Sequence, residues 1–196
     1  MEDERVSDSP DWRSRRWAAT HQRIYDAAME LFGEHGFEKV SVGQIAAGAK
    51  VSVPTFYAHY PSKEHIVMQL PTVEDIAAVI SGQPADLPVG ERIRRAVPAW
   101  FAGWTPEIRE HELARWQVIA RTPSLRVRAA EFERATAGMV TEALPAQGAI
   151  LRPGDTVVVN AYLSAYTAGL LAWADHDGDR KVEELIEEAF DALEGR

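Results

Sequence analysis

Residues 20–35 carry apolar side chains at the spacing of an α-helix, and this pattern constrains the fold more than any other feature of the chain. The apolar residues fall at i, i+3, i+4, i+7 and i+8 and are Ile24, Ala27, Ala28, Leu31 and Phe32. This spacing places them on one face of an amphipathic helix, and Gly36 favours its end. Because alanine and leucine are common and β-rich runs are few, the sequence predicts an all-α protein.

Two short helices are predicted next, each with its own N-terminal cap. Ser41 and Gln44 form the S-x-x-Q pattern of a capping box, which opens the first of them. Ser52 is a suitable N-cap for the second. Pro54 then lies in the first turn, where the missing N–H of proline costs no hydrogen bond and its fixed φ favours the helix. Pro54 therefore begins a helix and does not break one.

The second short helix has an apolar side and a polar side. Phe56 and Tyr60 are four residues apart and are expected to point inward together, while Thr55 and Tyr57 face elsewhere. Two short helices joined by a tight turn match the helix-turn-helix plan, in which the second helix lies in the major groove of DNA. Pro61 is expected to end this helix, and a fourth helix is predicted to run on toward residue 70.

Charge is distributed unevenly along the chain. The formal net charge of −9 argues by itself against a nucleic-acid partner, because phosphate binding requires positive charge. Residues 12–63, however, contain seven Lys or Arg against four Asp or Glu, a balance of +3, whereas residues 64–196 contain 13 against 21. A basic segment followed by an acidic body indicates two parts with different tasks.

The stretch from Arg16 to Gln69 resembles the DNA-binding domain of the TetR (tetracycline repressor) family. The resemblance rests on the run IYDAAMELFGEHGFEKVSVGQIAAGAKVSVPTFYAHYPSKEHI. This run holds a long first helix, an F-x-x-x-G-F loop, a short I-A helix and a T-F-Y-x-H-Y-x-S-K-E recognition helix. The resemblance implies a three-helix helix-turn-helix head at residues 16–63, preceded by a flexible arm at residues 1–15. A helical ligand-binding and dimerisation domain at residues 64–196 would follow.

The same resemblance assigns roles to individual residues of the head. Tyr57 matches the recognition-helix tyrosine, which contacts backbone phosphate and thymine methyl groups, and the alternative for it is surface packing. His59 and Lys63 match positions that hold phosphate. For Lys63 the alternative is a solvated side chain.

The chemistry of neighbouring side chains suggests further DNA contacts. The hydroxyl of Thr55 suits a phosphate or a base edge, and Val53 and Pro54 offer apolar contact to a thymine methyl group. Ser41 begins its helix and is expected to face a phosphate or only to cap the helix. Ser52 belongs to the same predicted surface. Because Val53 and Ala58 are short and apolar and Gly43 has no side chain, we expect readout to depend on DNA shape and methyl contacts.

Three arginines precede the first predicted helix. Arg13, Arg15 and Arg16 are expected to reach along the DNA backbone or into the minor groove, as N-terminal arms do. The alternative is a disordered tail.

Helices are also predicted for the remainder of the chain. After a loop near residues 81–89, which glycine and proline mark, the predicted helices are 90–103, 106–121, 124–144, 155–174 and 180–194. Pro71 and Pro98 fall inside helical patterns and predict kinks or, alternatively, helix boundaries.

Aromatic side chains cluster in this half and are candidates to line an apolar ligand cavity, the alternative for each being ordinary core. The predicted ligand-contacting residues are Trp100, Trp104, Trp116, Met139, Tyr162 and Tyr166. The last two predicted helices combine small residues with leucines, and the resemblance implies that they pair across a two-fold axis into a four-helix bundle. The predicted interface residues, some of which would instead face the core of their own subunit, are Ala161, Ala165, Ala168, Leu185 and Phe190.

Enzyme and metal-site motifs fail on particular residues. The chain has no cysteine, which excludes disulfides and Cys-ligated metal centres. The run DHDGDR suggests a calcium loop, but its sixth position is Arg180 and its twelfth is Ile186. After His111 and Glu112 a zinc protease would need a histidine where Arg115 stands. The protein is therefore predicted not to be an enzyme and to hold no metal or other cofactor.

The first residues, MEDERVSDSP, are acidic and polar, unlike a signal peptide, and no stretch is expected to reach the roughly 18 apolar residues of a membrane span. We therefore expect a cytoplasmic protein without membrane contact. The resemblance implies a homodimer that binds a palindromic duplex operator and leaves it when a small, largely apolar effector binds the C-terminal domain. The alternative is a catalytic or carrier helical domain on which the DNA-binding head is secondary.

Overall fold

The computed structural model describes residues 10–144 and 152–196, and within these ranges every regular element is a helix. The prediction of an all-α protein is confirmed. The chain divides into two compact units, with the boundary between Ile66 and Val67, whereas the sequence placed it between residues 63 and 64. Residues 1–9 of the predicted arm lie outside the described residues.

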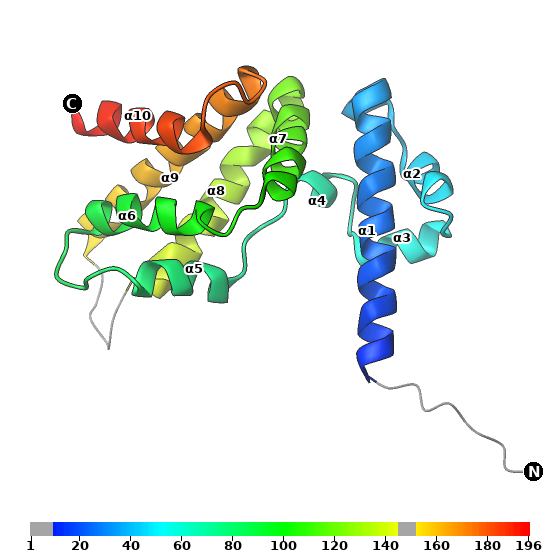
Figure 1. Ribbon diagram of the computed structural model, residues 1–196, viewed down its shortest axis with the longest axis horizontal. Helices are drawn as coiled ribbons and strands as arrows, with labels where there is room; N and C mark the ends of the chain where they lie inside the picture. The colour runs from blue at the N-terminus through cyan, green and yellow to red at the C-terminus, as the bar shows by residue number, and fades with distance from the viewer. Residues whose placement is uncertain (1–9, 145–151) are drawn as a thin grey trace, which may run out of the picture. The chain divides into compact units, whose positions relative to one another are not determined.

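The N-terminal unit is built on one long helix and three short elements (Figure 1). These are α1 (Pro10–His35), η1 (Phe37–Lys39), α2 (Val42–Gly48) and α3 (Val53–His59). The predicted apolar face of α1 is buried at Ile24, Ala28 and Phe32, and α2 packs against both α1 and α3. Phe56 and Tyr60 complete this core, as their spacing predicts.

The α1 helix begins well before its predicted start at Thr20. Residues 10–15, which the sequence placed in a flexible arm, are helical. Arginine and alanine are strong helix formers, so this run can be helical without an apolar face that periodicity would detect. The helix ends at His35, and the next residue, Gly36, has a φ of 82°, which favours glycine over other residues.

The predicted caps of the two short helices are confirmed. Ser41 and Gln44 form a reciprocal capping box at the start of α2, and Ser52 accepts a hydrogen bond from the Thr55 amide at the start of α3. Pro54 lies in the first turn of α3. These local motifs fix where each short helix starts, and hence which side of α3 faces outward.

The predicted fourth helix is shorter than expected. The α4 helix (Glu64–Val67) stops after four residues, and Pro71 lies in the connection to a separate helix, α5 (Val73–Ser81). Thr72 and Asp75 form a capping box that opens α5. Pro71 therefore marks a boundary and not a kink.

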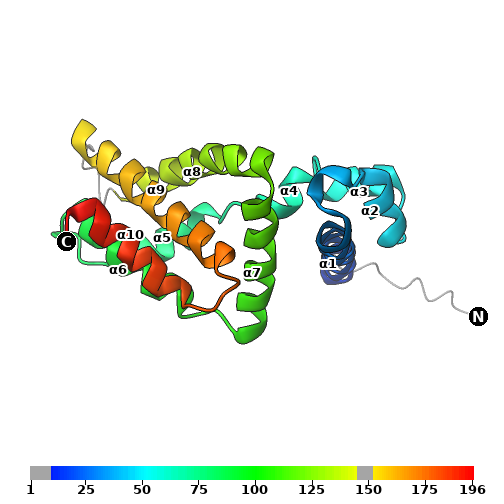
Figure 2. The same ribbon diagram turned by 90° about the horizontal axis from the view of Figure 1, so that it is seen from above.

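The C-terminal unit contains α5 and five longer helices. These are α6 (Val89–Phe101), α7 (Pro106–Arg121), α8 (Pro123–Ala143), α9 (Pro153–Asp175) and α10 (Val182–Glu194). In Figure 2, α9 lies between α8 and α10, and it also packs against α6 and α7. Pro98 lies inside α6, as predicted.

The close packing of α9 on α10 depends on a glycine. A Cβ atom at Gly169 would lie 2.6 Å from Ile186 Cγ1 and 2.7 Å from the Ile186 Cα. Because the second of these atoms belongs to the backbone, any larger residue at this position would push the two helices apart.

The expectation that no stretch is long and apolar enough to cross a membrane is wrong for α9 when length and composition alone are considered. The best window of this helix has a mean hydropathy of 1.3. Its position among α6, α7, α8 and α10 is that of the central helix of a helical domain, which passes the same test. This one helix is therefore weak evidence for a membrane span.

Candidate nucleic-acid interface and ligand cavity

The outer face of α3 consists of exposed side chains, and the opposite face of the helix is buried. Val53 is 41% exposed and Tyr57 is 53% exposed, and Pro54 is exposed beside them. Phe56, in the same helix, is fully buried, and its ring meets the Tyr57 ring edge-on at 5.4 Å. The burial of Phe56 fixes the rotation of α3 and so turns Tyr57 toward solvent.

Two of the predicted DNA-contacting hydroxyls take part in helix capping. Ser52 Oγ accepts from the Thr55 amide at 3.1 Å and is hydrogen-bonded to Thr55 Oγ1 at 2.7 Å. Ser41 Oγ donates to Gln44 Oε1 at 2.8 Å and accepts from the Gln44 amide at 3.3 Å. Ser41 therefore has the capping role that the sequence left open as its alternative, and a hydroxyl lone pair is all it could add for another partner.

Lys63 has an internal role that the sequence did not indicate. Its ammonium donates to the carbonyls of Phe37 at 2.8 Å and Val40 at 3.0 Å, and it lies 4.3 Å from the centre of the Phe37 ring. These contacts join the segment after α3 to the turn before α2. Lys63 is therefore not simply a solvated lysine, and two of its three donors are already used.

His59 belongs to an aromatic stack between α3 and α1. The Trp17 ring lies 4.8 Å from both the His21 and the His59 rings, and His21 stacks on Tyr60 at 4.2 Å. The Nδ1 atoms of both histidines are buried without a hydrogen-bond partner. Burial lowers the pKa of His59. The pKa of His21 is lowered mainly by burial and also by charge repulsion from His59. Both imidazoles are therefore mainly neutral at pH 7.

A basic hollow lies beside this stack in the N-terminal unit. We define the basic hollow by the cationic side chains that line it, Arg13, Arg16, Arg23 and Lys50. Ser52 and Thr55, at the start of α3, line it as well, and none of its described lining residues is acidic. Arg23 and Lys50 were not selected from the sequence, although the basic balance of residues 12–63 is the signal that includes them.

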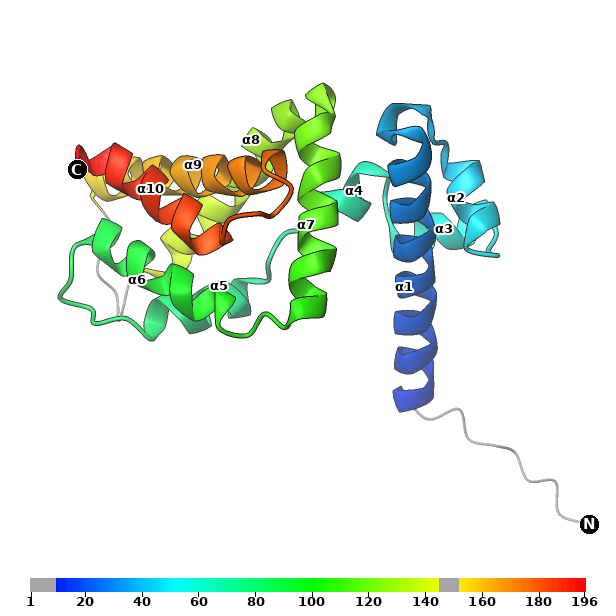
Figure 3. The same ribbon diagram turned by 45° about the horizontal axis from the view of Figure 1, so that its top comes forward.

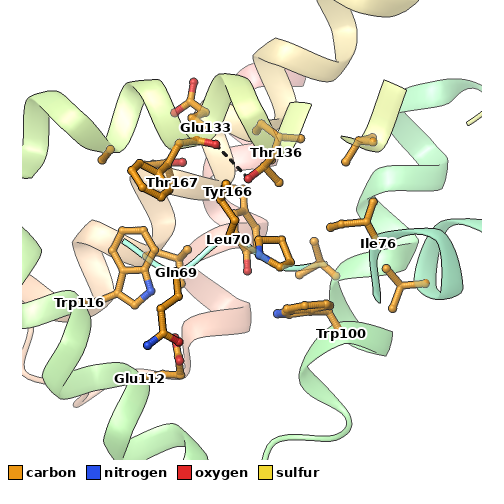
Figure 4. A pocket seen from close by; sticks show the side chains of 18 of the residues that line it. Gln69, Leu70, Ile76, Trp100, Glu112, Trp116, Glu133, Thr136, Tyr166 and Thr167 are labelled. Carbon is orange, nitrogen blue, oxygen red and sulfur yellow. Dashed lines mark hydrogen bonds between the residues drawn. The ribbon is translucent and has the colours of Figure 1, made fainter. Parts of the chain in front are cut away.

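The C-terminal unit contains a partly open cavity of about 310 Å³ that is lined mostly by apolar side chains. Four of the six predicted ligand-contacting residues line it: Trp100, Trp104, Trp116 and Tyr166. Figure 4 shows Trp100 and Trp116 on opposite sides of the cavity. Helices α5, α6, α7, α8 and α9 all contribute to its wall.

Tyr162 and Met139 do not line the cavity, so the prediction for these two residues is wrong. Tyr162 is turned toward α6 and α10, where its ring packs on Phe190 at 4.9 Å and its hydroxyl donates to Glu194. Gly90 makes this position possible, because a Cβ there would lie 2.7 Å from the Tyr162 ring. Met139 is partly buried and packs against the hydrophobic core instead.

The polar groups in the cavity wall include side chains from α7, α8 and α9. Arg115 pairs with Glu112, one turn earlier on α7, and its Nη1 donates to the Val67 carbonyl at 2.7 Å. Burial raises the pKa of Tyr166, which therefore keeps its hydroxyl proton and remains a hydrogen-bond donor. Thr136 donates to the Phe132 carbonyl at 3.0 Å, the bond drawn in Figure 4.

The five predicted interface residues separate into two groups. Leu185 and Phe190 are buried in the hydrophobic core of a single subunit, so their assignment to a subunit interface is corrected. Ala161 and Ala165 are partly exposed and Ala168 is exposed. These small residues on α9 remain available to a partner.

Within the part of the chain that the structure describes, no three or more His, Cys, Asp or Glu side chains are grouped so that they could hold a metal ion.

Comparison with known protein families gives matches to both units. The family described as "Bacterial regulatory proteins, tetR family" matches residues 24–70, and the family described as "MftR C-terminal domain" matches residues 87–196. The second match covers more than half of the chain.

Curated relatives match over shorter lengths. The transcriptional regulator TcmR of Streptomyces glaucescens is 30% identical over 127 residues, which is 59% of this chain and 54% of TcmR. MftR of Mycobacterium tuberculosis, a candidate transcriptional regulator of mycofactocin biosynthesis, is 44% identical over 52 residues, 26% of either chain. The chain thus spans about half of the first of these relatives and a quarter of the second.

Solved structures share the fold over nearly the whole chain. NalD, the secondary repressor of the MexAB-OprM multidrug efflux pump in Pseudomonas aeruginosa, aligns over 92% of this chain and 96% of its own, with TM-score 0.55 and 21% identity. FadR of Bacillus subtilis, solved in complex with stearoyl-CoA, aligns over 88% and 97%, with TM-score 0.53 and 18% identity. At these identities the likeness is one of fold alone.

Proposed function

Because the chain belongs to the TetR family of bacterial regulatory proteins, we propose that it is a ligand-responsive transcription regulator that binds duplex DNA through α3. The observation that carries this proposal is the exposure of Tyr57 and Val53 on a helix whose other side is fixed by buried Phe56. A short helix whose inner face is packed in the core and whose outer face is exposed suits insertion into the major groove.

The exposed face of α3 supports a particular kind of readout. The Tyr57 ring and the Val53 side chain suit contact with thymine methyl groups, while the Tyr57 hydroxyl and the Thr55 hydroxyl suit phosphate. A neutral His59 keeps one N–H, which can donate to a phosphate oxygen. Lys63 contributes mainly by holding the head together, since two of its protons bond to backbone carbonyls.

A two-fold dimer fits the small residues left exposed on α9. Ala161, Ala165 and Ala168 allow close approach of another helix, and Val157, one turn before Ala161, is 68% exposed. A dimer would present two copies of α3, and the duplex that it binds would then be palindromic.

The cavity supports a small, largely apolar effector. Its volume lies at the lower end of the range for ligand pockets, and its tryptophan-rich wall with few polar groups is typical of such sites.

Arg115 offers a route by which a bound effector would release DNA. Arg115 lies in the cavity wall and also donates a hydrogen bond to the carbonyl of Val67. Val67 is the last residue of α4, the helix that follows the recognition helix in the chain. An effector that displaces Arg115 or its partner Glu112 would free this end of α4. On this ground we propose that the protein is a repressor that leaves its operator on ligand binding.

The test uses duplexes recovered by the full chain from a random-sequence pool. Wild-type binding is expected to be sequence-selective and to weaken steeply with salt. Tyr57→Ala should lower affinity by roughly 10- to 100-fold, whereas Tyr57→Phe, which removes only the hydroxyl, should cost less. Val127→Ala, on a residue 72% exposed in the C-terminal unit, is the control and should bind as wild type does. Unchanged affinity in Tyr57→Ala would show that α3 does not read DNA.

A further inference from the structure

The first turns of α1 are exposed on all sides. In Figures 1 and 3 this part of the helix extends past α2 and α3. Residues 12–19 are all exposed, and they include two large aromatic side chains, Trp12 at 46% and Trp17 at 52% exposure. Both tryptophan side chains are therefore accessible to an external partner.

The same turns hold a concentration of positive charge. Residues 12–23 contain four arginines and no acidic residue, in a protein whose net charge is −9. A local excess of this size, opposed to the charge of the whole protein, favours a polyanionic partner.

The arginines do not all face the same way. Arg13, Arg16 and Arg23 line the basic hollow, together with Lys50, whereas Arg15 does not. The spacing of the three lining arginines places them along one stripe of the helix. This stripe is continuous with the start of α3, because Ser52 and Thr55 line the same hollow.

The two tryptophans are held in place by neighbours and do not form an apolar patch. The Arg16 guanidinium lies over the Trp12 ring at 5.2 Å from its centre. Trp17 stacks on His21 and His59, the latter in the last turn of α3. The stack therefore joins the start of α1 to the recognition helix within one unit.

We propose that residues 12–23 of α1 form a second DNA-contacting surface, which binds the sugar–phosphate backbone beside the half-site read by α3. The inference rests on the proposed function, because the basic hollow is shared with α3. Twelve helical residues span about 18 Å, which corresponds to roughly five base-pair steps along a DNA strand. The surface would thus extend the protected region of each half-site without adding base-specific contacts.

An anionic membrane surface is a less suitable partner. Interfacial helices carry a continuous apolar face opposite their charges. Here arginines lie between Trp12 and Trp17 in the sequence, and the two rings contact Arg16 and the histidine rings. The shared lining with Ser52 and Thr55 also directs the arginines to the partner that α3 binds.

The test compares two neighbouring arginines, of which Arg16 lines the basic hollow and Arg15 does not. Full-length protein carrying Arg16→Ala or Arg15→Ala is titrated onto the selected duplex, once with long flanks and once trimmed to the palindromic core. On the long duplex, Arg16→Ala should lose roughly tenfold in affinity. Its slope of log affinity against log salt should become shallower by about 1.8, because a dimer loses one phosphate contact in each half-site. Arg15→Ala should change both less, and the difference between the two variants should vanish on the trimmed duplex.

Footprinting and vesicle binding complete the design. Hydroxyl-radical cleavage of the long duplex should show protection outside the core with wild-type protein that is lost with Arg16→Ala. Equal effects of the two substitutions, or a footprint that Arg16→Ala leaves intact, would overturn the inference. So would flotation with phosphatidylglycerol vesicles that depends on Arg16 while DNA affinity does not.

A different set of results is expected if the proposed function itself is wrong. In that case wild-type protein would select no sequence from the pool, and Tyr57→Ala would bind DNA as wild type does. If wild-type binding is selective and Tyr57→Ala abolishes it while Arg16→Ala has no effect, only the second surface is refuted.

Discussion

The two units use their aromatic residues in opposite ways. In the N-terminal unit Trp12, Trp17 and Tyr57 are about half exposed, and they stand among arginines or on the outer face of α3. In the C-terminal unit Trp100 and Trp116 line a cavity. Charge divides in the same way, with a balance of +3 in residues 12–63 and an excess of acids after them. The comparison indicates one unit shaped for a large polyanion outside itself and one shaped for a small apolar molecule within.

The largest effect is expected when the buried aromatic ring on the inner side of α3 is removed. Phe56→Ala removes a fully buried ring and should lower the free energy of unfolding of this unit by about 3–5 kcal/mol. Tyr57→Ala, one residue later but exposed, should change it by less than about 0.5 kcal/mol. Urea unfolding resolved by hydrogen exchange of peptides from each unit measures both changes. Equal destabilisation by the two variants would contradict the assignment of inner and outer faces to α3.

A moderate effect is expected when the cavity loses one wall. Trp100→Ala should weaken binding of an apolar fluorescent probe, anilinonaphthalene sulfonate, by roughly tenfold because it removes an aromatic contact. Trp17→Ala, a matched substitution in the other unit, should leave probe binding unchanged. Fluorescence titration measures both. If Trp17→Ala weakened probe binding as much as Trp100→Ala does, the cavity would not be the apolar site that binds the probe.

The smallest expected effect is a difference between the two units in the pH at which each begins to lose stability. Burial lowers the pKa of His59 and His21 in the folded state. The unfolded chain therefore takes up protons first as pH falls below 6.5, and the N-terminal unit loses stability from that point. Hydrogen bonds from Tyr162 and then Arg94 lower the pKa of Glu194, so the C-terminal unit should lose this contribution only below about pH 4.5.

Hydrogen exchange at pH 7 and pH 5.5 measures this separation. Peptides of the N-terminal unit should lose protection at the lower pH while those of α9 and α10 keep theirs. The double variant His21→Gln and His59→Gln should remove the difference. Simultaneous loss of protection in both units would show that the histidine stack does not control the response.

Local patterns were the part of the fold that the sequence predicted well. The Ser41–Gln44 capping box, the Ser52 cap and the inward Phe56 depend on residues within four positions of one another. Spacing alone determines such features, because the helix repeat brings these residues together whatever the remainder of the chain does.

Contacts between distant segments were the part that the sequence could not predict. The partners of Lys63 lie 23 and 26 residues away. Tyr162 and Tyr166 share one helical stripe, yet only Tyr166 lines the cavity, because Gly90 makes room for the Tyr162 ring beside α6. Phe190 is buried against α9 of its own subunit, and the sequence of α10 alone does not distinguish this from burial against a partner.

The helical start of α1 was missed for a third reason. Residues 10–19 have no periodic apolar face, so the signal that revealed the later part of the helix was absent. Helix propensity alone favours this run, and the arginines that provide it are also the side chains proposed to contact DNA.

Photo-crosslinking from α3 tests most directly whether this helix is the part of the molecule that meets DNA. Full-length protein with Tyr57→p-benzoylphenylalanine is mixed with the selected duplex, irradiated and digested, and Val127→p-benzoylphenylalanine is the matched exposed position in the C-terminal unit. We predict a crosslink from position 57 to bases within the palindromic core and none from position 127. Crosslinks from position 127 with none from position 57 would contradict the account.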